Sequence, residues 1–303
     1  MALTRGQFAH LSTTDLMHWQ QHPLALPITD PTECSLGTGC GGYVLSKQPI
    51  EDTRDWIRPA SQALRDALGA PVVCEFKGGR YLYAGFPGGA SYAQELVFRE
   101  LVQEPDGSLS MKWPAEMIPP TGNKLALPCE PVKGRVAMAA HGVRVDGKDG
   151  FACGTLTRLP QNVRIKLRAK PEPGVGSFGL CCRGSGAYAQ GCELRFDPAR
   201  QRLEYGQPLD GESAVVPGRG AALDHVPDLD KQVTVDLIVK DGLVDVCVGN
   251  RRTLISRNSQ TGDRRQRAGI HLAATPVAAV QWACIHLMST LPGAWSHSPL
   301  CQT

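Results

Sequence analysis

A series of short runs in which apolar and charged residues alternate constrains the fold of this chain most strongly. In the run 163–168, which reads Val-Arg-Ile-Lys-Leu-Arg, every second residue is apolar. Successive side chains of a β-strand point to opposite faces, so this pattern predicts a strand with one buried and one solvated face. Similar short strands are expected at 177–183, 192–196, 202–205, 232–239, 243–248, 253–256, 269–273 and 280–287. Many short strands at close spacing predict a β-sandwich.

Glycine and proline make the rest of the chain rich in turns. The 303 residues include 33 Gly and 23 Pro, which disfavours long helices. In residues 1–125, short apolar runs such as 81–84 and 96–98 alternate with turn clusters such as Glu-Pro-Asp-Gly at 104–107, a pattern typical of strands joined by hairpins. At roughly 150 residues a domain, the length fits two domains. We therefore expect an all-β protein with two parts, followed by a loosely held tail.

The charge balance names no partner. Lys and Arg number 32 against 29 Asp and Glu, a net charge of +3, so no strong field draws the chain to nucleic acid or to an anionic membrane. Six arginines between 251 and 267 lack interleaved aromatic residues, so a solvated strand face is expected there rather than a nucleic-acid site. No apolar run approaches the roughly 20 residues of a membrane helix. The residues after Met1 lack the pattern of a secretory signal, which predicts a cytoplasmic protein.

The residues that could ligate metals do not have the spacing of a metal site. His10, His18, His22, Cys34 and Cys40 lie within 31 positions, but they lack the closely paired ligands of a zinc site. The odd count of 11 cysteines predicts reduced thiols rather than a complete disulfide framework. No glycine-rich segment continues into the Lys-Ser/Thr of a phosphate loop. The sequence thus predicts no metal and no cofactor.

The segment 8–27 contains an unusual concentration of turn and aromatic residues. Ser12 to Asp15 are expected to form a turn capped by their side chains, with Pro23 ending the element. Leu16 and Trp19 are expected to face inward. Trp19 is therefore a candidate core aromatic, and its ring could alternatively stack on a sugar.

This segment resembles glycoside hydrolase family 32, which comprises invertases, levanases and inulinases. The family reads approximately Gly-His-x-x-Ser-x-Asp-Leu-x-His-Trp, followed by Pro-x-Ala-Leu. The residues that correspond to this pattern are Ala9 in place of the glycine, His10, Ser12 one position before the serine of the pattern, Asp15, Leu16, His18, Trp19, Pro23, Ala25 and Leu26. The segments 74–85 and 94–109, with the triplet Arg99-Glu100-Leu101, look like the last propeller blade of the family. The segment 244–257 looks like strands of its C-terminal sandwich.

The resemblance implies a five-bladed β-propeller with a funnel-shaped active site, packed against a β-sandwich. It implies a partial propeller over 1–125, a sandwich over 130–290 and a tail over 291–303. It also implies retaining hydrolysis of fructose-containing sugars such as sucrose or fructan. Retaining enzymes need two carboxyl groups about 5 Å apart, one as nucleophile and one as acid.

The catalytic motifs of the family are where this sequence departs from it. No Asn-Asp-Pro motif, which carries the nucleophile, is present. The Arg-Asp-Pro and Glu-Cys motifs belong to middle blades, and at 39–43 the sequence passes from the first blade to the end of the fourth. Asp30-Pro31 and Asp197-Pro198 lack the preceding arginine and are expected to be turns. Glu75 follows Cys74 in the reverse order and is a weak candidate acid.

No catalytic residue is therefore assigned, and Trp19 and Thr38 are the candidate sugar contacts. We expect a family 32 homologue that is inactive as written. A carbohydrate-binding or structural sandwich module is the alternative, and a degenerate gene fragment is a third interpretation. Because sheets of an incomplete propeller expose their edges, self-association through those edges is possible.

Overall fold

The structure, a computed structural model, is all-β. It describes residues 8–26, 68–87, 96–119, 121–124, 129–139, 142–156, 162–185, 190–206, 208–209, 212–215, 221–240, 243–257, 269–274 and 279–290. Within these ranges the helical pieces are two 3-10 turns, η1 (Lys77–Gly79) and η2 (Ala115–Met117). No helix in the described ranges is long or apolar enough to span a membrane. The expected all-β class is confirmed.

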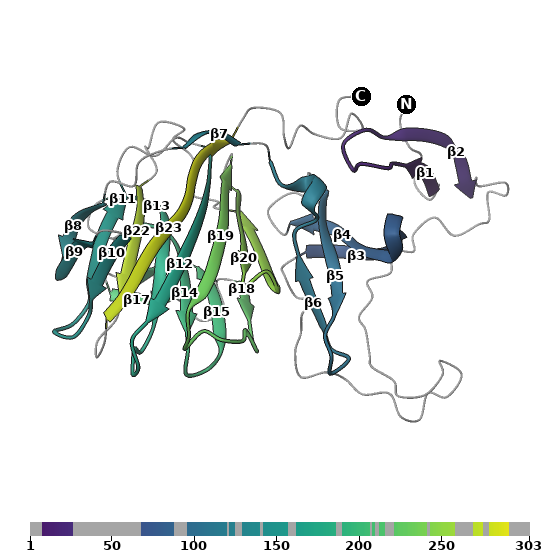
Figure 1. Cartoon of the computed structure of the whole chain (residues 1–303). Coiled ribbons are helices and arrows are strands. Elements are labelled where there is room, and N and C mark those ends of the chain that lie inside the picture. The colour runs from purple at the N-terminus through teal and green to yellow at the C-terminus, as the bar shows by residue number, and fades with distance from the viewer. Residues whose placement is uncertain are drawn as a thin grey trace.

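Two large antiparallel sheets make up the C-terminal part (Figure 1). The strands of the eight-stranded sheet are β7 (Thr121–Lys124), β9 (Arg135–Ala139), β10 (Gly142–Asp146), β12 (Val163–Pro171), β19 (Val233–Lys240), β20 (Leu243–Val248), β21 (Arg252–Arg257) and β23 (Ala279–Thr290). Their order is β21-β20-β19-β12-β23-β10-β9, with β7 beside β23. This sheet therefore includes residues that precede position 125.

The second sheet of this part has seven strands. They are β8 (Cys129–Lys133), β11 (Ala152–Leu156), β13 (Phe178–Ser185), β14 (Gln190–Asp197), β15 (Arg202–Gly206), β18 (Ala221–Leu223) and β22 (Gly269–Ala274). Their order is β18-β15-β14-β13-β22-β11-β8, and β16 (Pro208–Leu209) with β17 (Glu212–Val215) forms a separate two-stranded sheet in contact with β14 and β15. Every strand expected between 163 and 287 is present, which confirms the sandwich.

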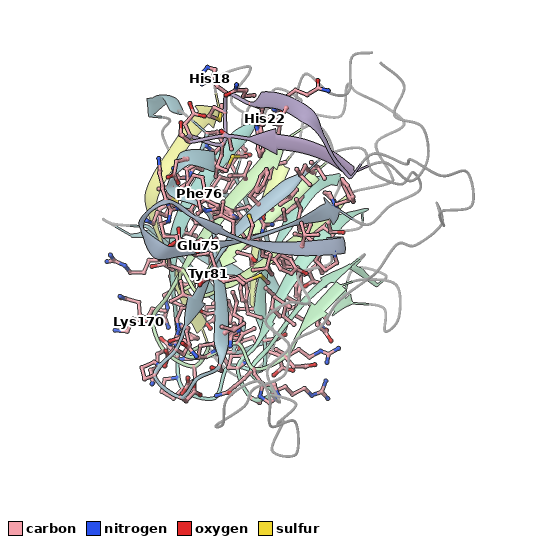
Figure 2. All side chains as sticks on the ribbon, turned by 90° about the vertical axis from the view of Figure 1, so that its right-hand side faces the viewer. His18, His22, Glu75, Phe76, Tyr81 and Lys170 are labelled. Carbon is pink, nitrogen blue, oxygen red and sulfur yellow. The ribbon has the colours of Figure 1, made fainter. Side chains whose placement is uncertain are left out.

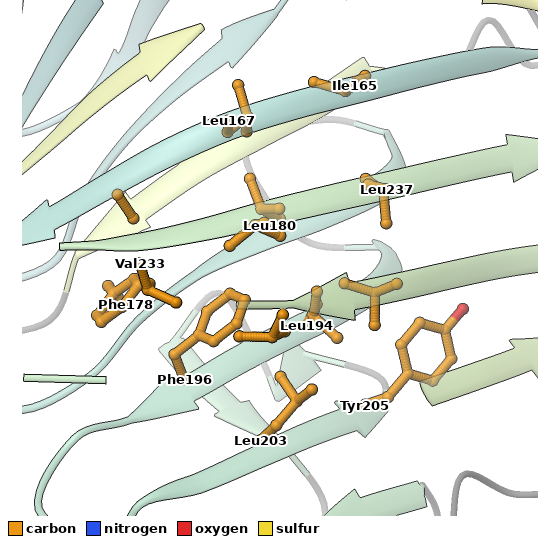
Figure 3. Close-up of a cluster of buried hydrophobic side chains, with 14 of the residues drawn as sticks. Ile165, Leu167, Phe178, Leu180, Leu194, Phe196, Leu203, Tyr205, Val233 and Leu237 are labelled. Atoms are coloured by element: carbon orange, nitrogen blue, oxygen red, sulfur yellow. The ribbon is translucent and has the colours of Figure 1, made fainter. Parts of the chain in front are cut away.

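The sandwich core consists of the inward-facing residues of both sheets. In β12 the predicted alternation holds, because Val163, Ile165 and Leu167 are buried while the residues between them are partly exposed. From the facing sheet, Phe178 and Phe196 stack with ring centroids 5.0 Å apart (Figure 3). Burial of such side chains supplies most of the driving force for folding.

The N-terminal part contains a four-stranded antiparallel meander, hereafter the blade. Its strands are β3 (Leu68–Phe76), β4 (Arg80–Pro87), β5 (Val97–Gln103) and β6 (Leu109–Lys112), which are neighbours in chain order. The turn predicted at 104–107 joins β5 to β6, and the Gly107 amide donates to the Glu104 carbonyl at 2.9 Å. Gly107 has φ 85°, a conformation that glycine adopts without strain.

A hairpin of β1 (Phe8–Ser12) and β2 (Gln20–Leu26) lies beside the blade. Pro23 does not end this element, contrary to expectation, because β2 continues through it to Leu26. The hairpin is a two-stranded sheet, so each strand has one unpaired side on which a residue without an N–H is tolerated.

Cys74, Cys129, Cys153 and Cys247, whose side chains the structure describes, are free thiols, as the sequence predicts. Burial raises the pKa of Cys129 and of Cys153 to about 11, and that of Cys247 to about 12. These three thiols are therefore protonated at neutral pH and poorly nucleophilic.

Candidate functional site

The predicted turn at the start of the segment that resembles family 32 is present and is held by its own side chains. Thr13 Oγ1 accepts a hydrogen bond from the Leu16 amide at 2.9 Å. Asp15 Oδ1 accepts from the Met17 and His18 amides at 2.9 and 2.8 Å, and its other oxygen lies 2.6 Å from His18 Nδ1. The His18 side chain and these amides hold the pKa of Asp15 well below its ordinary value. Asp15 is thus an ionised turn-forming residue.

Trp19 packs against the blade. Its ring stacks on Phe98 with centroids 5.7 Å apart and planes inclined by 24°. The indole Nε1 donates to the Leu16 carbonyl at 3.2 Å. Leu16 is 4% exposed and belongs to the same apolar cluster as Leu82 and Phe98. Trp19 itself is only partly buried. One part of the indole packs on the blade, and another part is exposed to solvent.

Two carboxyl groups meet beside this cluster, at Arg80. The guanidinium donates to Glu100 at 2.6 Å and to the two oxygens of Glu116 at 2.7 and 3.0 Å. Lys112 lies 3.0 Å from Glu100, and Lys77 lies 3.6 Å from Glu116. This group of five, the Arg80 cluster, is the arrangement of paired acids that sequence reasoning missed. The resemblance directed attention to acids in the catalytic motifs, whereas Glu100 and Glu116 lie outside those motifs.

The Arg80 cluster does not have the chemistry of a glycosidase pair. The Arg80 guanidinium lowers the pKa of Glu116 to about 2, and its own pKa is raised by Glu116 and Glu100. A general acid needs a raised pKa so that it holds a proton at working pH. Glu116 is instead ionised, and the positive charge of Arg80 balances its negative charge. The cluster is therefore a set of ion pairs.

The same arrangement occurs elsewhere without any catalytic geometry. In the sandwich, Arg202 Nε lies 2.6 Å from Glu204 and Arg202 NH1 lies 2.7 Å from Asp224. Two acids on one arginine therefore recur in this protein as an ordinary structural device, which supports the structural interpretation of the Arg80 cluster.

Glu75 lies at the exposed edge of the blade. Its partner across the ladder is Tyr81, and both side chains are exposed (Figure 2). The directly opposite position therefore holds a phenol rather than a second acid. Asp197 caps a turn by accepting from the Arg200 amide at 3.0 Å, as the sequence predicts.

Several sequence candidates lie outside the described residues. Thr38 and Asp30 are among them. So is Glu33, which precedes Cys34 in the Glu-Cys order of the family's acid motif and was overlooked in the sequence-based assignment. Within the described side chains no group of three or more His, Cys, Asp or Glu could hold a metal ion.

The arginine of the Arg-Glu-Leu triplet joins the blade to the sandwich. Arg99 donates to both oxygens of Asp245 on β20, at 3.1 and 2.9 Å, and Trp113 Nε1 donates to Asp245 Oδ1 at 3.2 Å. Arg99 and Asp245 are 1% and 2% exposed. Neighbouring residues of β5 point to opposite faces, so Glu100 reaches the Arg80 cluster on the other side. Asp245 was also missed, although it is the lone acid in an apolar strand.

A second polar contact continues this junction. The Met111 amide donates to the Arg251 carbonyl at 3.0 Å, and Arg251 Nε donates to Glu104 at 2.9 Å. Arg252 is 6% exposed. The expectation of a solvated arginine face is therefore wrong at Arg252, whereas the side chain of Arg251 is 43% exposed and remains partly solvated while it pairs with Glu104 of the blade.

Comparison with solved structures shows the fold. Fructan 1-exohydrolase IIa from Cichorium intybus matches 78% of this chain and 51% of its own, with 12% identity and a TM-score of 0.55. Exo-inulinase from Aspergillus awamori matches 75% of this chain and 43% of its own, with 12% identity and a TM-score of 0.50. The carbohydrate-binding module CBM66 from Bacillus subtilis matches 53% of this chain and 95% of its own, with 13% identity and a TM-score of 0.43.

No protein-family model and no curated protein matches the chain. The chain spans about half the length of the two enzymes named above. The likeness in fold rests on those two enzymes. It confirms the fold class of a partial β-propeller followed by a β-sandwich.

Proposed function

We propose that this chain is a homologue of family 32 glycoside hydrolases that binds fructose-containing sugars but does not cleave them. The main support for the proposal is the extent of the fold likeness to fructan 1-exohydrolase, which includes both the sandwich and the N-terminal part of the chain. Residues 121–290 are 170 of the 303 residues, or 56%, whereas the match to fructan 1-exohydrolase covers 78% of the chain. The likeness therefore extends beyond the sandwich into the N-terminal part.

The segment resemblance supports the same proposal independently. The matching positions in residues 9–26 include Asp15, Leu16 and Trp19. The first caps the turn, and the other two pack on the blade. In a closed ring of blades the first and last blades are neighbours. The hairpin and the blade, which resemble the first and last blades, contact each other as such neighbours would.

The arrangement of the carboxyl groups supports the proposal that the chain does not cleave sugars. Hydrolysis with retention needs a nucleophile and an acid about 5 Å apart. Among the described residues near the contact between hairpin and blade, Glu100 and Glu116 both pair with Arg80, and Asp15 is bonded within its own turn. Sugar binding is assigned to the partly exposed Trp19 and to Thr38, by stacking and hydrogen bonding respectively.

Hydrolysis and binding are tested separately on the whole chain. Incubation with sucrose, inulin or levan is expected to release no fructose, and calorimetric titration with inulin or levan is expected to show binding that dextran does not. Release of fructose that is abolished by Glu33→Gln would overturn the first half of the proposal. No heat of binding with any fructan would overturn the second half.

The range of each domain remains a prediction. The boundaries at 125 and 130 are tested by limited proteolysis, which is expected to leave a resistant fragment that corresponds to the sandwich. Cleavage within β7 would be inconsistent with the pairing of β7 to β23.

A further inference from the structure

The first strand of the blade, β3, presents an apolar edge. Within the described part of the chain it pairs with β4 alone. Its consecutive residues Val72 and Val73 are 63% and 52% exposed. Because consecutive side chains of a strand point to opposite faces, both faces of this strand are uncovered at that point. Cys74 and Glu75 are exposed as well.

The second half of this edge, from Val72 to Phe76, lacks the features by which proteins prevent strand addition. Natural edge strands are protected by lysines, prolines, bulges or covering elements. β3 has Pro71 and a register irregularity between Gly69 and Val72, which protect its first half. From Val72 to Phe76 the ladder with β4 is regular and carries a single charge, that of Glu75. Among the residues that the structure describes, the second half of β3 therefore has an edge on which one more strand could pair.

We propose that this half of β3 pairs antiparallel with the same strand of a second copy of the chain, with Cys74 opposite Cys74. Two identical antiparallel strands in one sheet are related by a twofold axis perpendicular to the sheet, so one residue must face itself. The regular run 72–76 has Cys74 at its centre. Centring the axis there pairs the whole run with itself.

The side chains of the strand are complementary to themselves in this register. On one face, Val72 lies opposite Phe76 of the second copy and Cys74 lies opposite its equivalent, which gives an apolar row. Pairs of aromatic and β-branched residues across strands are favourable. On the other face, Val73 lies opposite Glu75, so the two Glu75 carboxylates are not directly opposed. Centring on Glu75 would oppose them, which is unfavourable.

The pairing joins two four-stranded blades into one continuous sheet. It needs no other protein, and it covers the exposed valines of both copies. An unpaired apolar edge of this kind is what strand-addition interfaces use, with main-chain hydrogen bonds supplying affinity and side-chain pairs supplying specificity.

Sedimentation velocity of the full chain over a range of concentrations tests the pairing. We expect a reversible dimer whose Kd rises at least about tenfold in Val72→Lys, because the new ammonium lies near Lys77 and Arg80 of the partner copy. Met138→Lys is the matched control, since Met138 is 58% exposed on β9, far from this edge. A chain that is monomeric at every concentration would overturn the proposal, and so would a dimer that Val72→Lys leaves unchanged.

Oxidative cross-linking tests the register. Cysteines directly opposite each other on neighbouring antiparallel strands come close enough for a disulfide at non-hydrogen-bonded pairs, where the Cβ atoms approach most closely. Mild oxidation is expected to link two chains covalently, and Cys74→Ser is expected to remove the linked species while leaving the sedimenting dimer in place. Cross-linking that persists in Cys74→Ser would show a different contact and would contradict the register.

Discussion

The sandwich and the blade are both antiparallel sheets, but only the sandwich has a core of its own. The two sandwich sheets bury their apolar residues against each other in one continuous cluster. The blade buries its residues against other parts of the chain. On one face Leu82 and Phe98 pack with Leu16 and Trp19 of the hairpin. On the other face Val97 packs with Leu243 and Ile255 of the sandwich.

The difference explains why β20 is buried throughout. All of its residues are buried. A strand of a two-sheet sandwich usually has one face packed on the core and one face exposed to solvent. Val244, Val246 and Val248 face the sandwich core, whereas Leu243, Asp245 and Cys247 face the blade side. We therefore expect the sandwich to hold the blade in place, and we expect the core of the sandwich to be stable without the blade.

Removal of the buried carboxylate at the junction is expected to have the largest effect. Asp245→Asn leaves Arg99 with an uncompensated buried charge, so stability should fall by about 3–5 kcal/mol. The loss should be concentrated in the blade, and urea unfolding followed by the fluorescence of the tryptophans measures it. Asp149→Asn, at a pair with Arg135 that is more than two-thirds exposed, should cost less than about 1 kcal/mol. Equal losses in the two variants would contradict a buried junction.

A substitution within the sandwich tests whether the blade depends on the sandwich, and the closely packed Gly179 is suited to it. A Cβ added at Gly179 would lie 2.5 Å from the Leu194 carbonyl oxygen, which is backbone and cannot rotate away. Gly179→Ala should cost about 1–3 kcal/mol and should destabilise both parts, because the blade depends on the sandwich. At Gly154 the two nearest atoms belong to side chains, so Gly154→Ala should cost less. Thermal unfolding of both variants would show a reversed order if this reasoning fails.

The Arg80 cluster should give a smaller and pH-dependent effect. Glu116 has a folded pKa of about 2 against an ordinary 4.5, so its contribution is fully present above pH 4.5 and is lost as the pH falls towards 2. Glu116→Gln should cost about 1–2 kcal/mol at neutral pH and should flatten stability against pH in that acidic range. A variant with an unchanged acid profile would show that the Arg80 pairing contributes nothing.

Trp19 should have the smallest effect on stability. Trp19→Leu keeps an apolar side chain on Phe98 but loses the ring stacking and the Nε1 bond, at a cost of about 1 kcal/mol. If Trp19 also contacts sugar, fructan affinity should fall while the thermal midpoint changes little. A variant that binds fructan as tightly as the parent would restrict Trp19 to packing.

The strands and the local turn could be predicted from the sequence because they depend on neighbouring residues. The alternation of 163–168 defines β12, and the side chains of Thr13 and Asp15 are enough to form their turn. Apolar periodicity and side-chain capping act over a few positions, so a single sequence contains them.

The junction and the Arg80 cluster could not be predicted, because they join residues far apart in the chain. Arg99 and Asp245 are separated by 146 positions. Asp245 is the lone acid in the run Leu-Val-Asp-Val-Cys-Val at 243–248. A buried carboxylate needs a partner, but the run does not identify that partner. Likewise, the residues next to Arg252 in the sequence do not indicate that this arginine is buried.

Native-state hydrogen exchange of the full chain tests most directly whether the sandwich holds the blade. We expect the amides of β3 to β6 to exchange after a local opening of the blade. The free energy of that opening should be lower than the free energy of the opening that exposes the amides of β12, β19 and β20. In Asp245→Asn the blade opening should become easier still, while the sandwich amides keep most of their protection. Protection of the blade equal to that of the sandwich, in both the parent and the variant, would contradict it.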